Sequence, residues 1–236
     1  KSSIKLIVTR HEQAAAFMAA TYGRLTGKPG VCITTLGPGA LNLTTGAAYA
    51  LLGAMPMVML TGQKGILSSR QAKFQIVDIV NTFRPLTKLS LQIVSGATIP
   101  TLVRDAFRIA TQERPGPVLL ELPEDIAGEE TAPVELVHPH PIEIPIAHAA
   151  ALDRAADMIL KAQRPLIMLG AAASRPRSTA GIGDFVRRTK IPFFTTQMGK
   201  GTVSGGTNQY MGTAALSERD YVHEAIDRAD LIIAIG

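Results

Sequence analysis

The stretch that decides the fold reads Thr9-Arg10-His11-Glu12-Gln13-Ala14-Ala15-Ala16, directly after the β-branched run Ile4-Lys5-Leu6-Ile7-Val8. This order predicts a strand over residues 4–8 and a helix that begins at about Glu12. Open α/β sheets bind ligands outside the carboxyl ends of their strands, so the Glu12 carboxylate is expected at a ligand-binding edge. Because the chain from Pro29 to Gln63 carries no charged residue, Glu12 faces a long apolar and glycine-rich surface.

The composition of the 236 residues indicates a globular protein with a well-buried core, since 46% are hydrophobic and 18% are charged. Aromatic residues make up only 5% and tryptophan is absent, which argues against a stacking platform for single-stranded nucleic acid. The net charge is +5, but the basic residues are scattered, and the densest cluster is the short set Arg175, Arg177, Arg187, Arg188 and Lys190. We therefore expect no nucleic-acid partner, and a cofactor with a pyrophosphate fits the basic balance equally well.

The single cysteine, Cys32, lies in an apolar run, which excludes a disulfide framework and is typical of a buried thiol. Gly37-Pro38-Gly39, Gly53 and Pro56 divide the uncharged stretch into pieces shorter than the roughly 20 apolar residues of a membrane span. No basic-then-apolar leader opens the chain. These features favour a cytoplasmic protein without a membrane span. Both ends read as interior strands, so we expect a fragment of a longer protein.

Apolar periodicity and turn residues predict alternating helices and strands along the first half of the chain. The helix over residues 12–25 is expected to place Ala15, Met18, Tyr22 and Leu25 on one face and to end at Gly27. Further along we expect a loop over residues 64–73 and helices at 40–52, 74–80 and 98–112. The strands expected in this half are those at residues 31–35, 57–60, 89–94 and 117–122.

Residues 128–147 hold prolines at positions 133, 139, 141 and 145, which predicts an extended interdomain linker. The chain is therefore divided into a domain over residues 1–127, the linker, and a domain over residues 148–236. In the second domain we expect helices at 148–162, 178–189 and 217–228, and strands at 166–169, 191–195 and 230–235. Because strands and helices alternate, the predicted fold class is α/β with parallel sheets, truncated at the start of the first domain and the end of the second.

Several common site types are absent from the sequence. There is no Gly-x-Ser-x-Gly elbow, no phosphate-binding Gly-x4-Gly-Lys-Ser/Thr loop and no Gly-x-Gly-x-x-Gly after a strand. His138-Pro139-His140 supplies two imidazoles without a third ligand nearby, so we expect no metal site in this chain. Taken alone, Glu12 is compatible with an ordinary acid in a first helical turn, Gly37-Pro38-Gly39 with a plain connector, and Arg114 with a solvated turn residue.

Four segments form a combination that is specific where the single segments are not: Arg10–Ala15, Tyr22–Val31, Gly37–Asn42 and Pro56–Gln63. Together they resemble the pyrimidine-binding domain of thiamine-diphosphate enzymes, and most of all the acetolactate synthase (acetohydroxyacid synthase) large subunit. The segments Arg114–Val118 and Leu122–Asp125 extend the resemblance. It covers nearly the whole chain and is strongest over residues 9–63.

This resemblance implies roles for residues of the first domain. Glu12 would be the catalytic acid that bonds N1′ of the cofactor's aminopyrimidine, so that the 4′-nitrogen can remove the proton from thiazolium C2. An uncharged, dry setting would strengthen that bond. Gln75 is the second catalytic candidate, because the Phe-Gln pair of the family faces the substrate. The cofactor-binding residues implied in this domain are Gly37, Pro38, Gly39, Asn42 and Phe74.

The second half resembles the family's central domain, Rossmann-like in fold, which holds a structural FAD in acetolactate synthases. Flavin contacts are implied for Arg114, Gly170, Thr195, Thr196, Gln197, Gly212 and Thr213. The chain departs from the family pattern at Ala172, where a glycine is typical, at Met211, where a histidine is frequent, and at Glu124, where a lysine is common. These departures weaken the FAD assignment and the choice of substrate, and they indicate a divergent acetolactate-synthase-like branch.

The activity implied is that of a transferase that condenses two 2-keto acids, such as pyruvate, with decarboxylation in branched-chain amino-acid biosynthesis. The Gly-Asp-Gly motif that would bind Mg²⁺ and the diphosphate is not in the sequence, so those ligands are expected outside it. The domain of Glu12 meets the diphosphate domain of a second subunit in the family, which implies a homodimer or homotetramer. The resemblance is also compatible with a regulatory subunit.

Alternatives stay open at this point. Another thiamine-diphosphate enzyme, such as a plain decarboxylase, glyoxylate carboligase or sulfoacetaldehyde acetyltransferase, would keep the cofactor and change the reaction. A non-catalytic binding module on a degenerate thiamine or nucleotide fold is favoured by the missing half of the cofactor site. An NAD-dependent enzyme draws only on the parallel sheet and ranks last.

Overall fold

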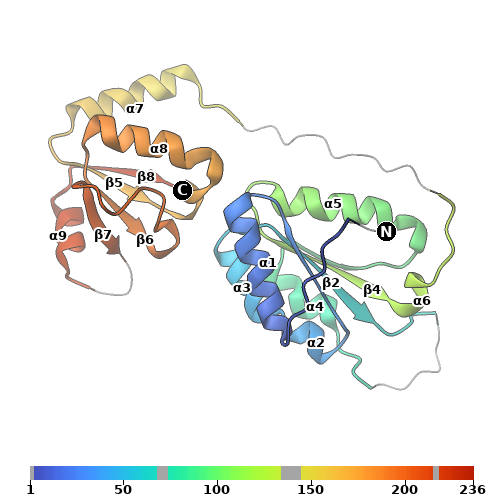
Figure 1. The fold of residues 1–236 in the computed structure, drawn as a ribbon. Coiled ribbons are helices and arrows are strands. Elements are labelled where there is room, and N and C mark those ends of the chain that lie inside the picture. Colours follow the sequence, from blue (N-terminus) through green and yellow to red (C-terminus); the bar gives the residue numbers. More distant parts are fainter. Residues whose placement is uncertain (1–2, 68–73, 134–144, 215–217) are drawn as a thin grey trace. The chain divides into compact units, whose positions relative to one another are not determined.

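The computed structural model describes residues 3–67, 74–133, 145–214 and 218–236, which fall into two compact units (Figure 1). The first unit comprises residues 1–142 and the second residues 143–236. Each unit is an α/β structure with its own sheet. The α/β class predicted for both halves is therefore confirmed. The exact domain bounds at residues 127 and 148 stay predictions, since residues 134–144 of the proposed linker lie outside the described ranges.

The first unit is built on a four-stranded sheet in the order β1-β2-β4-β3, with every neighbouring pair parallel. Its strands are β1 (Gly30–Thr34), β2 (Met57–Gln63), β3 (Leu89–Gln92) and β4 (Pro117–Pro123). The helices are α1 (Glu12–Thr26), α2 (Pro38–Leu41), α3 (Thr44–Leu52), α4 (Ile79–Phe83), α5 (Ile99–Thr111) and α6 (Glu124–Ala127), with short 3-10 turns at Arg84–Leu86 and Gly96–Thr98.

Successive side chains of a strand point to opposite faces, so each face of this sheet has its own cover. Ala106 and Ala110 of α5 are buried against Val58, Val118 and Leu120, which form the apolar core of one face. The opposite face carries the alternate residues of β2 and β4, and the segment leading into α4 hydrogen-bonds to it through the Val77 carbonyl. The two faces therefore differ in chemistry as well as in cover.

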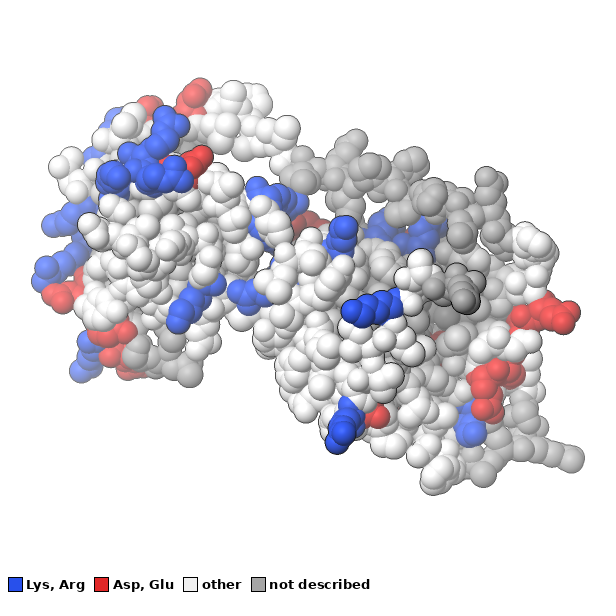
Figure 2. Space-filling model, in the orientation of Figure 1, with Lys and Arg blue, Asp and Glu red and all other residues white. Residues whose placement is uncertain are grey.

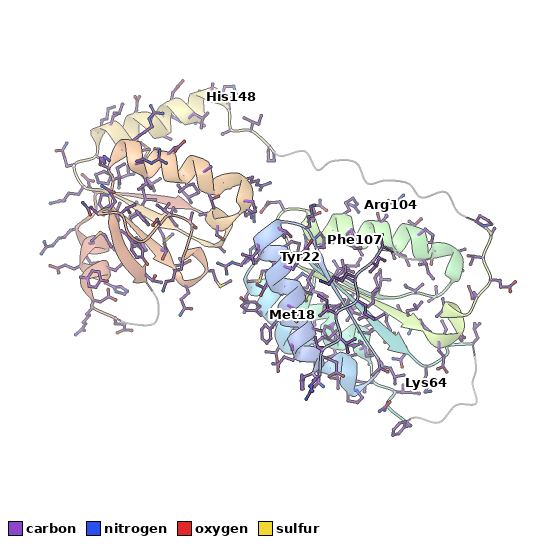
Figure 3. All side chains as sticks on the ribbon, viewed as in Figure 1. Met18, Tyr22, Lys64, Arg104, Phe107 and His148 are labelled. Atoms are coloured by element: carbon purple, nitrogen blue, oxygen red, sulfur yellow. The ribbon has the colours of Figure 1, made fainter. Side chains whose placement is uncertain are left out.

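The apolar face predicted for the first helix is not its buried face. Met18, Tyr22 and Leu25 are 48%, 51% and 70% exposed, and Met18 and Tyr22 follow one another along α1 in Figure 3. The buried residues of α1 are instead the small ones, Ala16, Ala19, Ala20 and Gly23. They allow backbones to approach closely: a Cβ added to Gly46 of α3 would lie 2.3 Å from the Ala16 Cβ. Close packing of backbones has overridden the burial of the larger side chains.

The predicted strand over residues 4–8 is also wrong. Residues 3–9 have no strand or helix in the structure, and Ile4, Leu6 and Val8 are 85%, 76% and 85% exposed. A β-branched run becomes a strand only where a neighbouring strand supplies its hydrogen bonds, and among the described residues no strand pairs with it. β1 is thus an edge strand of the described sheet.

Other elements differ in detail. The helix predicted over residues 40–52 is divided into α2 and α3, and the helix predicted at 74–80 begins only at Ile79, where Asp78 caps it by accepting from the Asn81 N–H at 3.0 Å. The predicted loop over residues 64–73 falls partly outside the described ranges, as does the start of the helix predicted at 217–228. The remaining helices and strands of the first unit lie within a few residues of the prediction.

The second unit contains a parallel sheet in the order β7-β6-β5-β8. β7 was missed in the sequence, because its glycine and the polar residues before it read as a loop. The strands are β5 (Pro165–Leu169), β6 (Phe193–Thr196), β7 (Tyr210–Ala214) and β8 (Leu231–Ile235). The helices are α7 (Ala149–Lys161), α8 (Pro176–Thr189) and α9 (Tyr221–Arg228), with 3-10 turns η3 (Ala171–Ser174) and η4 (Gln197–Gly199).

A polar cluster is buried on the first sheet, at the carboxyl ends of three neighbouring strands. Thr61 and Gln63 of β2 are 1% and 8% exposed, and Glu121 of β4 is 2% exposed. The Gln63 amide donates to Glu121 Oε1 at 2.8 Å, and the amide of Gln92 in β3 donates to Oε2 at 2.5 Å. Burial raises the pKa of Glu121, and the two amide hydrogen bonds oppose that rise. The Thr61 hydroxyl has no hydrogen-bond partner among the residues described.

Replacement of Thr61 by valine should stabilise the protein. The substitution removes a buried hydroxyl that has no hydrogen-bond partner in the described part of the chain, and such a group costs about 1–3 kcal/mol when it is left unsatisfied. We expect an increase in the free energy of unfolding of roughly 1 kcal/mol, measured by urea denaturation. The matched control is Thr195→Val: Thr195 is also 1% exposed, but its hydroxyl bonds the Thr213 hydroxyl at 3.0 Å, so this change should destabilise. A loss of stability in Thr61→Val would show that the hydroxyl has a partner.

Glu121→Gln should change how stability depends on pH. Because the folded-state pKa of Glu121 is raised above the unfolded value of 4.5, its contribution is fully present below pH 4.5 and is lost as pH rises through the folded pKa. Glutamine does not ionise, so the variant should gain stability relative to the wild type over that range. Unfolding free energies measured from pH 4 to about pH 8 would test this. A difference between the two proteins that stays constant with pH contradicts it, and Glu130→Gln at an exposed position is the control.

Candidate functional site

Glu12 is the first residue of α1, as the sequence predicts, and its carboxylate lies at the positive end of the helix dipole. His11 caps the helix, its ring nitrogen accepting the Gln13 backbone N–H at 3.1 Å. Glu12 is neither buried nor fully exposed in the described chain. The expectation of a dry setting is therefore not met within this chain alone.

Asn42 fixes the orientation of the Glu12 carboxylate, although 30 residues separate the two in sequence. Its side-chain amide donates to Glu12 Oε2 at 2.9 Å. This bond is the main cause that lowers the pKa of Glu12, with help from the residue's own backbone N–H and from nearby His11, against a small opposing effect of burial. The group is therefore ionised at neutral pH, and an ionised carboxylate can only accept hydrogen bonds.

The Gly37-Pro38-Gly39 turn starts α2 beside this carboxylate. Gly37 has a φ of +57°, a region that favours glycine, and Pro38 occupies the first turn of the helix, where its missing N–H costs nothing. A Cβ added to Gly39 would lie 3.4 Å from Glu12 Oε1 and 2.7 Å from the Thr35 methyl group. The glycine therefore lets the start of α2 pack closely against Thr35 and the Glu12 carboxylate.

Gln75 reaches the same place from the segment before α4. A Cβ added to Gly37 would lie 2.5 Å from the Gln75 carbonyl oxygen and 3.0 Å from its Cβ, so these residues are in close contact. Gln75 has a φ of +60°, and Phe74 beside it is 73% exposed. The structure thus brings Glu12, Asn42 and the glycine turn together, with the backbone of Gln75 against the turn. Thr35, which contacts Gly39, was not singled out in the sequence, although its position at the end of a strand was a signal.

Arg114 lies elsewhere in the first unit. Its guanidinium donates to the carbonyl oxygens of Leu51 at 3.1 Å and Leu52 at 2.6 Å, and so caps the C-terminal end of α3. The helix has nine residues and is about 13 Å long, so Arg114 is at the end distant from Asn42. Its implied flavin contact stays a prediction.

The other residues implied for the flavin gather at one edge of the second sheet. Gly170 directly follows β5, Thr195 and Thr196 end β6, and Gln197 opens η4. Thr213 of β7 bonds Thr195 hydroxyl to hydroxyl, and Gly212 before it has a φ of +121°. Parallel strands end at the same edge of a sheet, and this edge is where such folds bind ligands. The six residues named for this unit are therefore brought together, and their role toward a flavin stays a prediction.

The part of the chain that the structure describes contains no group of three or more His, Cys, Asp or Glu side chains arranged to hold a metal ion. His138 and His140 lie outside it. Nor does any described helix have the length and apolar character needed to span a membrane.

Asn42→Leu should raise the pKa of Glu12, since the lost amide is the largest cause that lowers it. A titration of side-chain-labelled glutamate by NMR would measure the change. The matched control is Asn81→Leu, because Asn81 donates to Asp78 Oδ2 at 2.7 Å in an equivalent amide–carboxylate pair. That variant should raise the pKa of Asp78 and leave Glu12 unaffected. An unchanged Glu12 titration in Asn42→Leu would mean that the amide does not bond the carboxylate in solution.

Comparison with models of protein families places both units in one group of enzymes. Residues 1–82 match the N-terminal TPP binding domain of thiamine pyrophosphate enzymes, and residues 152–236 match the central domain of thiamine pyrophosphate enzymes. The first match includes Glu12, the glycine turn, Asn42 and Gln75. The second includes the polar edge of the second sheet.

Curated relatives match over the whole chain. The acetolactate synthase isozyme 2 large subunit of Escherichia coli is 35% identical over 241 residues, which cover 99% of this chain and 42% of that protein. A probable acetolactate synthase large subunit of Methanocaldococcus jannaschii is also 35% identical, over 100% of this chain and 41% of its own. The acetolactate synthase large subunit of Parasynechococcus marenigrum is 38% identical over 99% and 39%. The chain thus spans about two fifths of the length of these relatives.

Proposed function

Because the chain belongs to the thiamine pyrophosphate enzyme family, we propose that it supplies the pyrimidine-binding half of the cofactor site of an acetolactate-synthase-like transferase. The whole enzyme condenses two 2-keto acids with decarboxylation, and pyruvate is the substrate we propose, in branched-chain amino-acid biosynthesis. The names of the relatives support this reaction.

The observation that carries the proposal is the Glu12–Asn42 pair beside Gly39. The ring nitrogen of an aminopyrimidine donates a hydrogen bond once it is protonated, and it then needs an acceptor and a backbone that can come close to the ring. The Glu12 carboxylate supplies the acceptor, and the missing side chain of Gly39 lets the backbone of the turn come close to Oε1. The residues present therefore fit the pyrimidine. When bound, thiamine diphosphate supplies the electron sink for decarboxylation of a 2-keto acid.

The chain's own residues then have distinct tasks. Asn42 donates to Glu12 Oε2, and Oε1 is the oxygen that lies beside Gly39. At Oε1 Glu12 would share one proton with the ring nitrogen: the protonated carboxyl group would donate it to the nitrogen, and the carboxylate would then accept the resulting N–H bond. Gln75 lies against Gly37, and we assign it to the substrate side of the site. A carboxylate fixed before the reaction needs no reorganisation during it, and this preorganisation lowers the barrier.

We propose a homodimer or homotetramer, since half-exposed Glu12 needs a second subunit to exclude water from it. Exposed apolar side chains on α1, β1 and the end of α3 support an interface there: Met18, Tyr22, Leu25, Val31, Ile33 and Leu52. The visible surface of the first unit is largely uncharged in Figure 2. The term large subunit in the names of the relatives supports proposing a regulatory subunit as well.

The remaining cofactors are proposed on less direct grounds. Mg²⁺ would be bound together with the diphosphate by residues outside this sequence. FAD would lie along the edge of the second sheet, where the end of β5 and η4 approach so closely that a Cβ on Gly199 would be 1.9 Å from the Leu169 carbonyl oxygen. Flavin absorbance of the purified full-length protein tests the FAD proposal. A cytoplasmic location is supported by buried, unpaired Cys32, which fits a reducing compartment.

Glu12→Gln should lower kcat for acetolactate formation from pyruvate, measured on the full-length protein with saturating thiamine diphosphate and Mg²⁺. Glutamine cannot take up the ring proton, and loss of a positioned acid or base costs about 10²-fold to 10⁴-fold in rate. Glu130→Gln, a change of the same kind at an exposed position, should have no effect. Wild-type turnover in Glu12→Gln would end the proposal.

The same preparation separates the alternatives. Product from glyoxylate alone indicates a carboligase of that type, product from sulfoacetaldehyde indicates an acetyltransferase, and acetaldehyde without acetolactate indicates a plain decarboxylase. A protein that binds the cofactor and turns over none of these substrates would favour the non-catalytic module.

A further inference from the structure

A second acid of the first unit, Glu121, has surroundings unlike those of Glu12. It is 2% exposed, and each carboxylate oxygen accepts an amide N–H from a neutral side chain, Gln63 on one side and Gln92 on the other. Asp78, another acid, acts on it electrostatically and raises its pKa further. Among the described residues no cation pairs with this buried carboxyl group, and burying such a group is costly. Its hydrogen bonds show what it does at this position.

The side-chain amide of Gln63 makes three hydrogen bonds. Its nitrogen donates to Glu121 Oε1 at 2.8 Å and to the Val77 carbonyl at 3.1 Å, and its oxygen accepts the Lys64 backbone N–H at 2.9 Å. A carboxylate accepts hydrogen bonds only, so Glu121 allows Gln63 to present only its NH₂ group. The same NH₂ group then meets the Val77 carbonyl. Glu121 Oε1 and the Lys64 N–H therefore select together the amide orientation in which Gln63 bonds the Val77 carbonyl.

The segment that is tied leads to the functional site. Val77 stands two positions after Gln75, which contacts Gly37 at the start of α2. Residues 74–78 belong to no helix or strand, so side-chain bonds rather than a backbone ladder must fix them. Farther along the chain, the Ser90 hydroxyl of β3 donates a hydrogen bond to the Val80 carbonyl oxygen at 2.8 Å, and Asp78 caps α4. The Gln63 bond secures the part nearest to Gln75.

We propose that Glu121 is a positioning residue that acts through the Gln63 amide and the Val77 carbonyl to hold Gln75 against the Gly37 turn. The chain of contacts runs from β4 through β2 to the segment before α4, and from there to the turn beside Glu12. The effect of Glu121 on turnover rests on the proposed function. The link from Glu121 through Gln63 and Val77 to Gln75 is a property of the fold and does not.

The test compares two replacements of Glu121 in the full-length protein. Glu121→Met has a similar size but no acceptor, so Gln63 loses its selected orientation. Amide hydrogen exchange over residues 76–83, measured without cofactors, should become about tenfold faster, the effect of losing one buried hydrogen bond. kcat should fall with little change in KM for pyruvate. Glu121→Gln should restore both quantities toward wild type, because its amide oxygen still accepts from Gln63 and its NH₂ can donate to a reoriented Gln92.

Two controls keep the result specific. Thr61→Val alters the same buried polar cluster without removing a hydrogen bond, and it should leave exchange over residues 76–83 and kcat unchanged. Exchange in α5, on the opposite face of the sheet, reports whether Glu121→Met is globally destabilised. If it is, Gln63→Leu replaces it, since that change removes the bond to Val77 directly. The double variant Glu121→Met/Gln63→Leu should be no faster in exchange than Gln63→Leu alone, because both changes break one path.

Wild-type exchange over residues 76–83 in Glu121→Met and Gln63→Leu would overturn the proposal, as would independent, multiplying effects of the two changes. A failure of the proposed function looks different. In that case Glu12→Gln keeps full turnover while the exchange of residues 76–83 still responds to Glu121→Met.

Discussion

The hydrogen bond from the Asn42 amide to the Glu12 carboxylate is the contact on which the rest of the first unit depends. It joins the start of α1 to the end of α2, so it exists only if these helices approach closely. It also orients a carboxylate that lies beside Gly39, within the uncharged stretch between Pro29 and Gln63. A carboxylate without this partner would rotate freely at the helix start and present no defined acceptor.

Small residues make that approach of the helices achievable. α1 contacts its neighbours through Ala16, Ala19 and Gly23. A Cβ on a glycine that faces them would collide with backbone or with alanine. On Gly30, for example, it would lie 2.0 Å from the Ala19 carbonyl oxygen. The cost is that the larger side chains of α1 are left outside. In an isolated chain this loses hydrophobic burial, and it becomes favourable if another surface covers them. The packing that builds the site and the proposed subunit interface thus have the same origin.

Sequence reasoning worked where the signal was local. The alternation of strands and helices gave the parallel α/β class, the end of an apolar run gave the position of Glu12, and the glycine turn pointed to α2. The family resemblance drawn from these segments is confirmed by matches to both domain models. Sequence reasoning failed where the structure of a segment depends on residues distant in the sequence. Residues 4–8 have strand propensity without a neighbouring strand, and β7 is held by pairing with β6 despite its glycine.

The buried polar cluster of the first sheet also depends on contacts between residues that are distant in the sequence. Gln63 and Glu121 are 58 residues apart, and each reads in the sequence as a polar residue near the end of a strand. Only the register of β2 and β4 places them within one hydrogen bond, with Thr61 opposite Glu121. No periodicity or motif in the sequence indicates a contact between Gln63 and Glu121, so only the structure reveals this hydrogen bond.

The two acids of the first unit then divide the work by their environments. Asn42 and a helix start lower the pKa of Glu12 and keep an ionised acceptor near solvent, ready for a ring nitrogen. Burial raises the pKa of Glu121, which has only neutral amides on its oxygens. Environments that push two carboxyl groups in opposite directions commonly separate their roles. Glu12, which solvent can reach, is suited to exchange a proton. Buried Glu121 is suited to orient the Gln63 amide, which bonds the segment that contains Gln75.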